Sequence, residues 1–227
     1  LLTSSQEFRI KAVDLAGNRT KWESRYFLDR TAPVVNFEGV TNGQLLSQPG
    51  QLTFQITEEI NEYGTIHFEA TRLFEGAASQ IECLDCKMTD RETLLQRFYD
   101  RDGIYTIVIH ASDVAGNVSE AVQVVFRVDV TAPVITLSGP SDGGHFCTEK
   151  ELLIEIEEEF YQGNQVLLQV TRSLPGSSEA YSIGDWNSDC KKSKLVHTFQ
   201  KDGIYHIRVE AVDEAGHKAE SKQLSFM

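Results

Sequence analysis

The chain has 227 residues, about twice the length of an ordinary β-sandwich domain with some sequence left over. Its 34 acidic and 21 basic residues give a net charge of −13, which repels nucleic-acid phosphates and anionic lipid surfaces and attracts cations. No stretch approaches the ~18 consecutive apolar residues of a membrane span, and the first residues carry no basic segment ahead of an apolar one. We therefore expect an excised piece of a longer exported protein that binds no nucleic acid and inserts nothing into a membrane.

The chain repeats itself with a period of 100 residues. The string DGIYTIVIHASDVAGN from Asp102 matches DGIYHIRVEAVDEAGH from Asp202, and FRIKAVDLAGN from Phe8 matches the later part of both. The string DRTAPVV from Asp29 likewise matches DVTAPVI from Asp129. A fixed period means that each unit is a copy of one structural module. We expect three modules: an incomplete one that contributes an F–G hairpin over 1–29, and complete ones over 30–129 and 130–227.

Strands are expected where apolar and polar residues alternate between clusters of Gly, Asn, Asp or Pro. Tyr105, Ile107, Ile109 and Ala111 share one face of their strand, and we expect that face to be buried. Short strands at regular spacing without any helical period indicate an all-β sandwich. The expected strands of the first complete module are 52–57, 66–72, 94–98, 105–111 and 122–128, and those of the second are 152–157, 166–172, 195–199, 205–211 and 223–226.

Two recurring turns support this organisation. The segment 113–117 (DVAGN) is expected to close a hairpin, because Gly116 can adopt a positive φ and the Asp113 carboxylate can accept hydrogen bonds from turn amides. In TAPVV and TAPVI the proline keeps the chain extended and cannot donate to a central strand ladder. These strings therefore mark the entry into a new module, near Arg30 and near Val130.

The run YTIVIHASDVAGNVS and the later VDVTAPVI resemble the repeated immunoglobulin-like domains of large bacterial cell-surface adhesins and biofilm proteins. The resemblance covers nearly the whole chain and implies tandem immunoglobulin-like (Greek-key) β-sandwiches. Tyr105 and Tyr205 resemble the tyrosine corner of such sandwiches. Ile107 and Ile207 stand where antibody domains have their second cysteine, which excludes the inter-sheet disulfide of antibodies.

The resemblance implies a structural or adhesion module of an exported bacterial surface protein, located outside the cell. Its partners would be neighbouring immunoglobulin-like modules and a surface protein or glycan. We expect no enzyme, because the sequence has no G-x-S-x-G elbow, no phosphate-binding glycine loop and no H-x-x-x-H pair. The alternative is an accessory carbohydrate-binding module of a larger surface enzyme, with Tyr161, Tyr181 and Trp186 as a stacking platform; the other interpretation of Trp186 is packing over the sandwich edge.

Calcium is the cofactor expected at the module junctions. In an immunoglobulin-like strand order the incoming linker, the B–C turn and the F–G turn gather at one pole, and calcium takes six to eight oxygen ligands. Some adhesin repeats that this chain resembles bind calcium with linker and turn aspartates, and the resemblance implies that role for Asp29, Asp113, Asp129 and Asp213. The alternative is that Asp14, Asp113 and Asp213 only cap their hairpin turns while the glutamates form a solvated rim. The candidate ligands are Asp29, Glu58, Glu59 and Asp113 at the first junction, and Asp129, Glu158, Glu159 and Asp213 at the second.

Four cysteines complete the candidates. A single C-x-x-C can serve a redox centre, half of a zinc site or a short-loop disulfide. We place the stretch with Cys83 and Cys86 between strands, where no helix end would lower a thiol pKa. In an exported protein we expect one disulfide in each module, Cys83 with Cys86 and Cys147 with Cys190. The second bridge requires the intervening loops to bend back, because the two cysteines precede strands that start at opposite poles.

Overall fold

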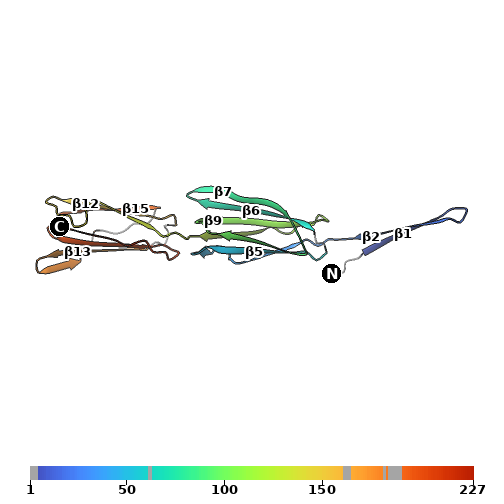
Figure 1. Ribbon diagram of the computed structural model, residues 1–227, viewed down its shortest axis with the longest axis horizontal. Coiled ribbons are helices and arrows are strands. Elements are labelled where there is room, and N and C mark those ends of the chain that lie inside the picture. Colours follow the sequence, from blue (N-terminus) through green and yellow to red (C-terminus); the bar gives the residue numbers. More distant parts are fainter. Residues whose placement is uncertain (1–4, 61–62, 161–164, 181–182, 184–190) are drawn as a thin grey trace.

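The computed structural model describes residues 5–60, 63–160, 165–180, 183 and 191–227. Within these ranges the chain forms strands and no helix, so none of them offers a helix that could cross a membrane. Figure 1 shows an elongated molecule in which an N-terminal hairpin, a first sandwich and a second sandwich follow one another along the long axis. The sequence repeat is therefore laid out in space as a row of units.

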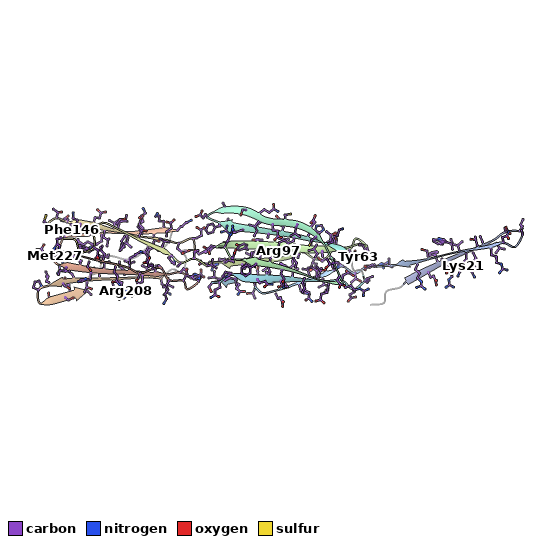
Figure 2. All side chains as sticks on the ribbon, viewed as in Figure 1. Lys21, Tyr63, Arg97, Phe146, Arg208 and Met227 are labelled. Atoms are coloured by element: carbon purple, nitrogen blue, oxygen red, sulfur yellow. The ribbon has the colours of Figure 1, made fainter. Side chains whose placement is uncertain are left out.

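The hairpin consists of β1 (Ser5–Val13) and β2 (Arg19–Phe27), paired antiparallel. Its side chains project from a two-stranded ribbon, on which Lys21 is labelled in Figure 2. Phe8, Ile10 and Trp22 are each more than half exposed. A two-stranded sheet cannot bury a core of its own, so these apolar side chains of the hairpin remain exposed.

The first sandwich has two sheets. One has the strand order β3-β5-β8 and the other β4-β10-β9-β6-β7. All pairs are antiparallel except β4 with β10, which run parallel through Arg127 beside Leu45 and Val128 beside Leu46. The strands are β3 (Val34–Glu38), β4 (Leu45–Leu46), β5 (Gly50–Thr57), β6 (Gly64–Phe74), β7 (Ala77–Lys87), β8 (Glu92–Tyr99), β9 (Gly103–Asp113) and β10 (Val122–Val128).

The second sandwich repeats this pattern. Its sheets have the orders β11-β12-β15 and β14-β13-β16-β17, and a parallel bridge between Gly144 and Phe226 stands in the place of β4 and β10. Consecutive strands cross between the sheets at equivalent points in both units, which is the immunoglobulin-like arrangement. The strands are β11 (Val134–Ser138), β12 (Lys150–Glu157), β13 (Gln165–Leu174), β14 (Ser177–Ala180), β15 (Lys192–Phe199), β16 (Ile204–Val212) and β17 (Lys222–Phe226).

Each sandwich has its own hydrophobic core. All four residues expected on the inner face of β9, from Tyr105 to Ala111, are buried, and the alternation along that strand is complete. The largest fully buried side chains of the first core are Phe54, Phe68 and Phe126. The second core is assembled from the equivalent strands around Ile154, Ile207 and Val209, together with Phe226. The prediction of an all-β sandwich with these strands is confirmed.

The tyrosine corner is present in both sandwiches. The Tyr105 hydroxyl donates to the carbonyl of Arg101 at 2.8 Å, and the Tyr205 hydroxyl donates to the carbonyl of Lys201 at the same distance. Ile107 and Ile207 are buried in the positions where antibody domains carry a cysteine. In each sandwich the tyrosine hydroxyl thus fixes the chain just before the strand, β9 or β16, that has isoleucine in place of that cysteine.

Strand β7 corrects two predictions. The stretch with Cys83 and Cys86 does not lie between strands but within β7, at the edge of its sheet. Residues three apart on a strand point to opposite faces and lie about 10 Å apart, whereas a disulfide needs Cα atoms within about 7 Å. The predicted Cys83–Cys86 disulfide is therefore wrong, and both thiols are free. Cys147 is also a free, exposed thiol, and Cys190 lies outside the described residues.

The tyrosine corner can be tested against a tyrosine in the same core. Tyr105→Phe removes the hydrogen bond to Arg101 and should lower the free energy of unfolding by about 1 kcal/mol. Tyr99 is the matched control, because its buried hydroxyl has no partner among the described residues and Tyr99→Phe should be neutral or stabilising. Urea unfolding measures both. Equal losses in the two variants would contradict a specific role for the Tyr105 hydrogen bond.

Candidate cation sites at the module junctions

The first candidate site lies where the hairpin joins the first sandwich. It brings together Asp29 from the linker, Glu58 after β5 and Asp113 at the end of β9, with one carboxylate oxygen from each lying within 4.8 Å of the others. These are the three segments that the sequence predicts at one pole. Three carboxylates at such separations repel one another unless a cation or protons lie between them.

The turn that follows β9, which is the F–G turn of the first sandwich, fixes the carboxylate of Asp113. Asn117 donates from its backbone N–H to Asp113 Oδ1 at 2.9 Å and from its side-chain amide to Oδ2 at 2.8 Å, and Gly116 turns the chain with a φ of 91°. The same contacts join Asp14 to Asn18 in the exposed hairpin. The turn-capping role considered from sequence is therefore real. It positions the carboxylate and does not prevent its unused lone pairs from facing the cluster.

Glu58 brings a buried oxygen without a partner. Its backbone N–H donates to the Arg91 carbonyl at 2.8 Å, and its Oε1 accepts the Ile60 N–H at 2.9 Å. The side chain is buried, and among the described residues its Oε2 has no hydrogen-bond partner. A buried carboxylate oxygen without a donor is costly, so this atom is an available ligand.

The second candidate site lies between the two sandwiches and centres on Asp129, Asp213 and His217. Asp129 follows β10 directly, and its backbone N–H donates to the Leu46 carbonyl at 3.0 Å. Its side chain has 0% exposure, and neither carboxylate oxygen has a hydrogen-bond partner in the part of the chain that the structure describes. One ligand atom from each of the three residues lies within 4.8 Å of the others.

Burial shapes the electrostatics of the second site. Burial raises the pKa of Asp129 to about 7, with the negative charges of Asp213 and Glu158 acting in the same direction. Burial also raises the pKa of Glu158, with the charge of Asp213 adding to the effect. The negative charges of Asp129, Glu158 and Asp213 therefore repel one another in the folded protein. A bound cation would offset this repulsion.

His217 occupies the turn position that is Asn117 in the first sandwich. Its backbone N–H donates to Asp213 Oδ1 at 2.8 Å, its Nδ1 lies 3.1 Å from Asp213 Oδ2, and its Nε2 lies 2.9 Å from the Ser47 carbonyl oxygen. Burial acts to lower the pKa of His217, but the Ser47 carbonyl and the charges of Asp213 and Asp129 outweigh it and raise that pKa. The F–G turn of the second sandwich thereby contacts the first.

Asp102 of the first sandwich accepts two hydrogen bonds from the linker. Its Oδ1 accepts the Val130 N–H at 2.6 Å, and its Oδ2 accepts the Thr131 hydroxyl. Asp102 is buried by these contacts, whereas the equivalent Asp202 at the far pole of the second sandwich is exposed. The sequence alone does not reveal this role, because both aspartates stand in the same string DGIY and differ only in their surroundings in the folded chain.

A polar network joins the two sandwiches around this site. Arg127 of β10 pairs with Glu214 of the F–G turn at 2.8 Å. Lys191 lies 2.6 Å from Glu75 of the first sandwich and 2.7 Å from Glu159 of the second, and the Glu75 N–H donates to Glu159 at 2.7 Å. These ion pairs and this hydrogen bond thus connect the second sandwich to the first.

The other predicted site residues lie elsewhere. Glu59 is exposed beside the first cluster, and Glu159 is engaged by Lys191 and Glu75. Neither of them, nor the buried Glu158, belongs to the group of close ligand atoms at its junction. The expected aromatic platform of Tyr161, Tyr181 and Trp186 lies outside the described residues.

The solved structures that resemble this chain share little of its sequence. No family model matches the chain, and no curated protein matches it. Among solved structures, the chicken CNTN1 FN1-FN3 domains share 16% identity over 97% of this chain and 74% of their own, with a TM-score of 0.29. The ICAM-5 D1-D4 ectodomain fragment is 11% identical over 99% of this chain and 61% of its own, with a TM-score of 0.46. The titin A168169 structure is 12% identical over 86% of this chain and 98% of its own, with a TM-score of 0.39. The fold therefore rests on the strand order itself.

The buried charge of Asp129 predicts a pH-dependent gain of stability on its removal. In the presence of chelator, Asp129→Asn should raise the free energy of unfolding by about 1–3 kcal/mol at neutral pH, because it replaces a buried carboxylate without partners. The folded-state pKa is raised from 3.8 to about 7, so the folded protein carries no charge penalty below pH 3.8. The gain should be absent there and grow as the pH rises to about 7.

Asp29→Asn is the matched control, because Asp29 occupies the same linker position but is partly exposed and accepts the Thr31 N–H at 3.0 Å. Denaturant unfolding at several pH values measures both variants. The interpretation would be wrong if Asp129→Asn destabilised the metal-free protein, or if both variants changed stability equally.

Proposed function

We propose that this chain is a segment of an extended array of immunoglobulin-like modules from an exported bacterial surface protein, which acts outside the cell by spacing or presenting binding loops and is stiffened by cations at its module junctions. The observation that supports the proposal most directly is the convergence, at both junctions, of a linker aspartate with the F–G turn aspartate of the next sandwich. Such a function is mechanical and needs no reacting group. The immediate partners of each module are its neighbours along the chain.

The short linkers support a rod-like arrangement. Only residues 129–133 separate β10 from β11, and residues 28–33 separate β2 from β3. Prolines at positions 33 and 133 restrict the backbone within these linkers. With so few residues between strands, contacts at the poles decide the angle between neighbouring sandwiches (Figure 1). An array of such units keeps its reach only if these contacts persist.

The ion pairs between the two sandwiches stabilise their contact only weakly. Exposed ion pairs such as Arg127–Glu214 and Lys191–Glu75 each contribute at most about 1 kcal/mol and are screened by salt. A cation that ligates both the linker and the sandwich would cross-link two segments and neutralise repelling carboxylates at the same time. The network would then set the orientation, and the cation would hold it.

Calcium suits the first junction best. Asp29, Glu58 and Asp113 offer only oxygen atoms, and the Glu58 Oε2 is buried without a partner among the described residues. Calcium prefers carboxylates, carbonyls and water in a flexible shell of six to eight oxygens. Backbone carbonyls and water can complete such a shell around three carboxylates.

Calcium should therefore stabilise the protein through Asp113. At about a hundredfold excess over its dissociation constant, one bound ion raises the free energy of unfolding by about 2.7 kcal/mol. Thermal unfolding with calcium and with chelator should show this gain in the parent chain and its loss in Asp113→Asn. Asp14→Asn is the control, because Asp14 makes the same turn contacts to Asn18 on the exposed hairpin. Identical curves with calcium and chelator would overturn the calcium proposal.

The inter-sandwich network predicts a charge-swap effect on shape rather than on stability. Arg127→Glu and Glu214→Arg should each change the free energy of unfolding by less than about 1 kcal/mol but broaden the range of angles between the sandwiches. The double variant restores opposite charges and should narrow that range again. Small-angle X-ray scattering measures the distribution of lengths. A double variant as flexible as the single ones would show that this ion pair does not orient the modules.

A further inference from the structure

The two junction clusters differ in one ligand type. The residue four positions after the aspartate of the F–G turn is Asn18 in the hairpin and Asn117 in the first sandwich, but His217 in the second. In the first two turns the amide nitrogen donates to the aspartate, so the residue serves only to cap the turn. An imidazole can instead offer a nitrogen lone pair, which changes the chemistry of the second junction.

The contacts of His217 define which nitrogen is available. Its Nε2 lies 2.9 Å from the Ser47 carbonyl oxygen, and a carbonyl can only accept, so Nε2 carries the proton. The Nδ1 atom then faces Asp213 Oδ2 at 3.1 Å. A bare lone pair facing a carboxylate oxygen is unfavourable, so a proton or a metal ion belongs beside Nδ1. A ring that donates one N–H to a backbone carbonyl and turns its other nitrogen to acidic ligands has the arrangement of a metal-binding histidine.

Asp129 is a second, independent indication of a ligand. Its carboxylate has no exposure, and neither of its oxygens meets a hydrogen-bond donor among the described residues. One of these oxygens lies within 4.8 Å of the ligand atoms of both Asp213 and His217. A metal ion between the three groups would be held by two carboxylates and one imidazole, and would give the buried Asp129 carboxylate the partner that it otherwise lacks in this part of the chain.

We propose that the second junction binds a divalent transition-metal ion of the zinc class through Asp129, Asp213 and His217, whereas the first junction takes calcium. Imidazole is a ligand for zinc and related ions, whereas calcium takes oxygen ligands. Two carboxylates and one imidazole make a three-residue protein set that water can complete to four-coordination. His217 thus supplies a nitrogen ligand at the second junction, where the third ligand of the first junction is the carboxylate of Glu58.

The ion would also fasten the two sandwiches together. Asp129 lies on the linker and Asp213 on the second sandwich, while the ring of His217 is oriented by Ser47 of the first sandwich. Outer hydrogen bonds of this kind align a ligating ring and strengthen its binding. Occupancy of the site should therefore depend on the contact between modules, and that contact should in turn be strengthened by the ion.

This inference rests on the proposed function in so far as both assign cations to the junctions, and the reciprocal exchange of His217 and Asn117 separates them. The probes are zinc chloride and calcium chloride, added singly and measured by isothermal titration calorimetry and thermal unfolding. These measurements use a background with the substitutions Cys83→Ala, Cys86→Ala, Cys147→Ala and Cys190→Ala, so that thiolates do not bind zinc. In the chain with its natural cysteines, the thiols contribute equally to every variant, so the same differences in zinc affinity between variants are expected.

In the parent, zinc should bind with one tight equivalent and raise the melting temperature. His217→Asn should weaken that binding by at least about 100-fold, more than the loss of an outer hydrogen bond costs, while calcium still stabilises the first junction. Asn117→His should create a second zinc equivalent. His217→Gln is the folding control: a polar side chain of similar length should leave the metal-free melting temperature near that of His217→Asn.

Zinc affinity unchanged by His217→Asn would overturn the inference while leaving the calcium proposal intact. Calcium binding at both junctions with no zinc equivalent would do the same. If neither ion binds, the proposal of cations at the junctions is overturned as a whole. If zinc binds, is lost in His217→Asn, and calcium does not bind, the zinc inference is supported and the proposed calcium site at the first junction is overturned.

Discussion

The burial of the Asp129 carboxylate is the constraint on which the junction between the sandwiches depends. A carboxylate with no exposure, and with no hydrogen-bond donor among the described residues, is unfavourable by itself. It is held there because β4 and β10 of the first sandwich pair in parallel, Leu46 accepts the Asp129 N–H, and Asp102 accepts the N–H of the next residue. The backbone is thus engaged while the side chain is left near Asp213, and either a proton or a cation would relieve the repulsion between the two carboxylates.

If the proposed ion binds, its occupancy is linked to mechanics. The second cluster combines Asp129 of the linker with Asp213 and His217 of the second sandwich, and Ser47 of the first sandwich orients the His217 ring, so the cluster depends on the contact between the two sandwiches. Surface pairs such as Arg127–Glu214 also join the two sandwiches, each at modest energy. With the proposed ions bound, a repeated module of this kind could vary its stiffness from junction to junction through single turn residues such as Asn117 and His217.

Much of the fold could be predicted from the sequence because the repeat and the period-two pattern report burial directly. The pattern predicts strand β9 with its inner face, and the resemblance to immunoglobulin-type sandwiches implies the tyrosine corner at Tyr105. Strand β7 escapes prediction, because it is an edge strand with little burial and its residues show no strong alternation. That omission leads to the wrong Cys83–Cys86 disulfide, since a loop can bring two cysteines together and an extended strand cannot.

The sequence by itself determined the modules, their inner faces and the aspartates of linker and turn, because these depend on local pattern and on repetition. Tertiary structure alone decided that Asp129 is fully buried while Asp29 is not, and that Asp102 is engaged while Asp202 is exposed. It also decided that His217 meets Ser47, a residue 170 positions earlier. The physical reason is that burial and ligand geometry at a junction come from contacts between units distant in sequence, and equal local strings experience different surroundings there.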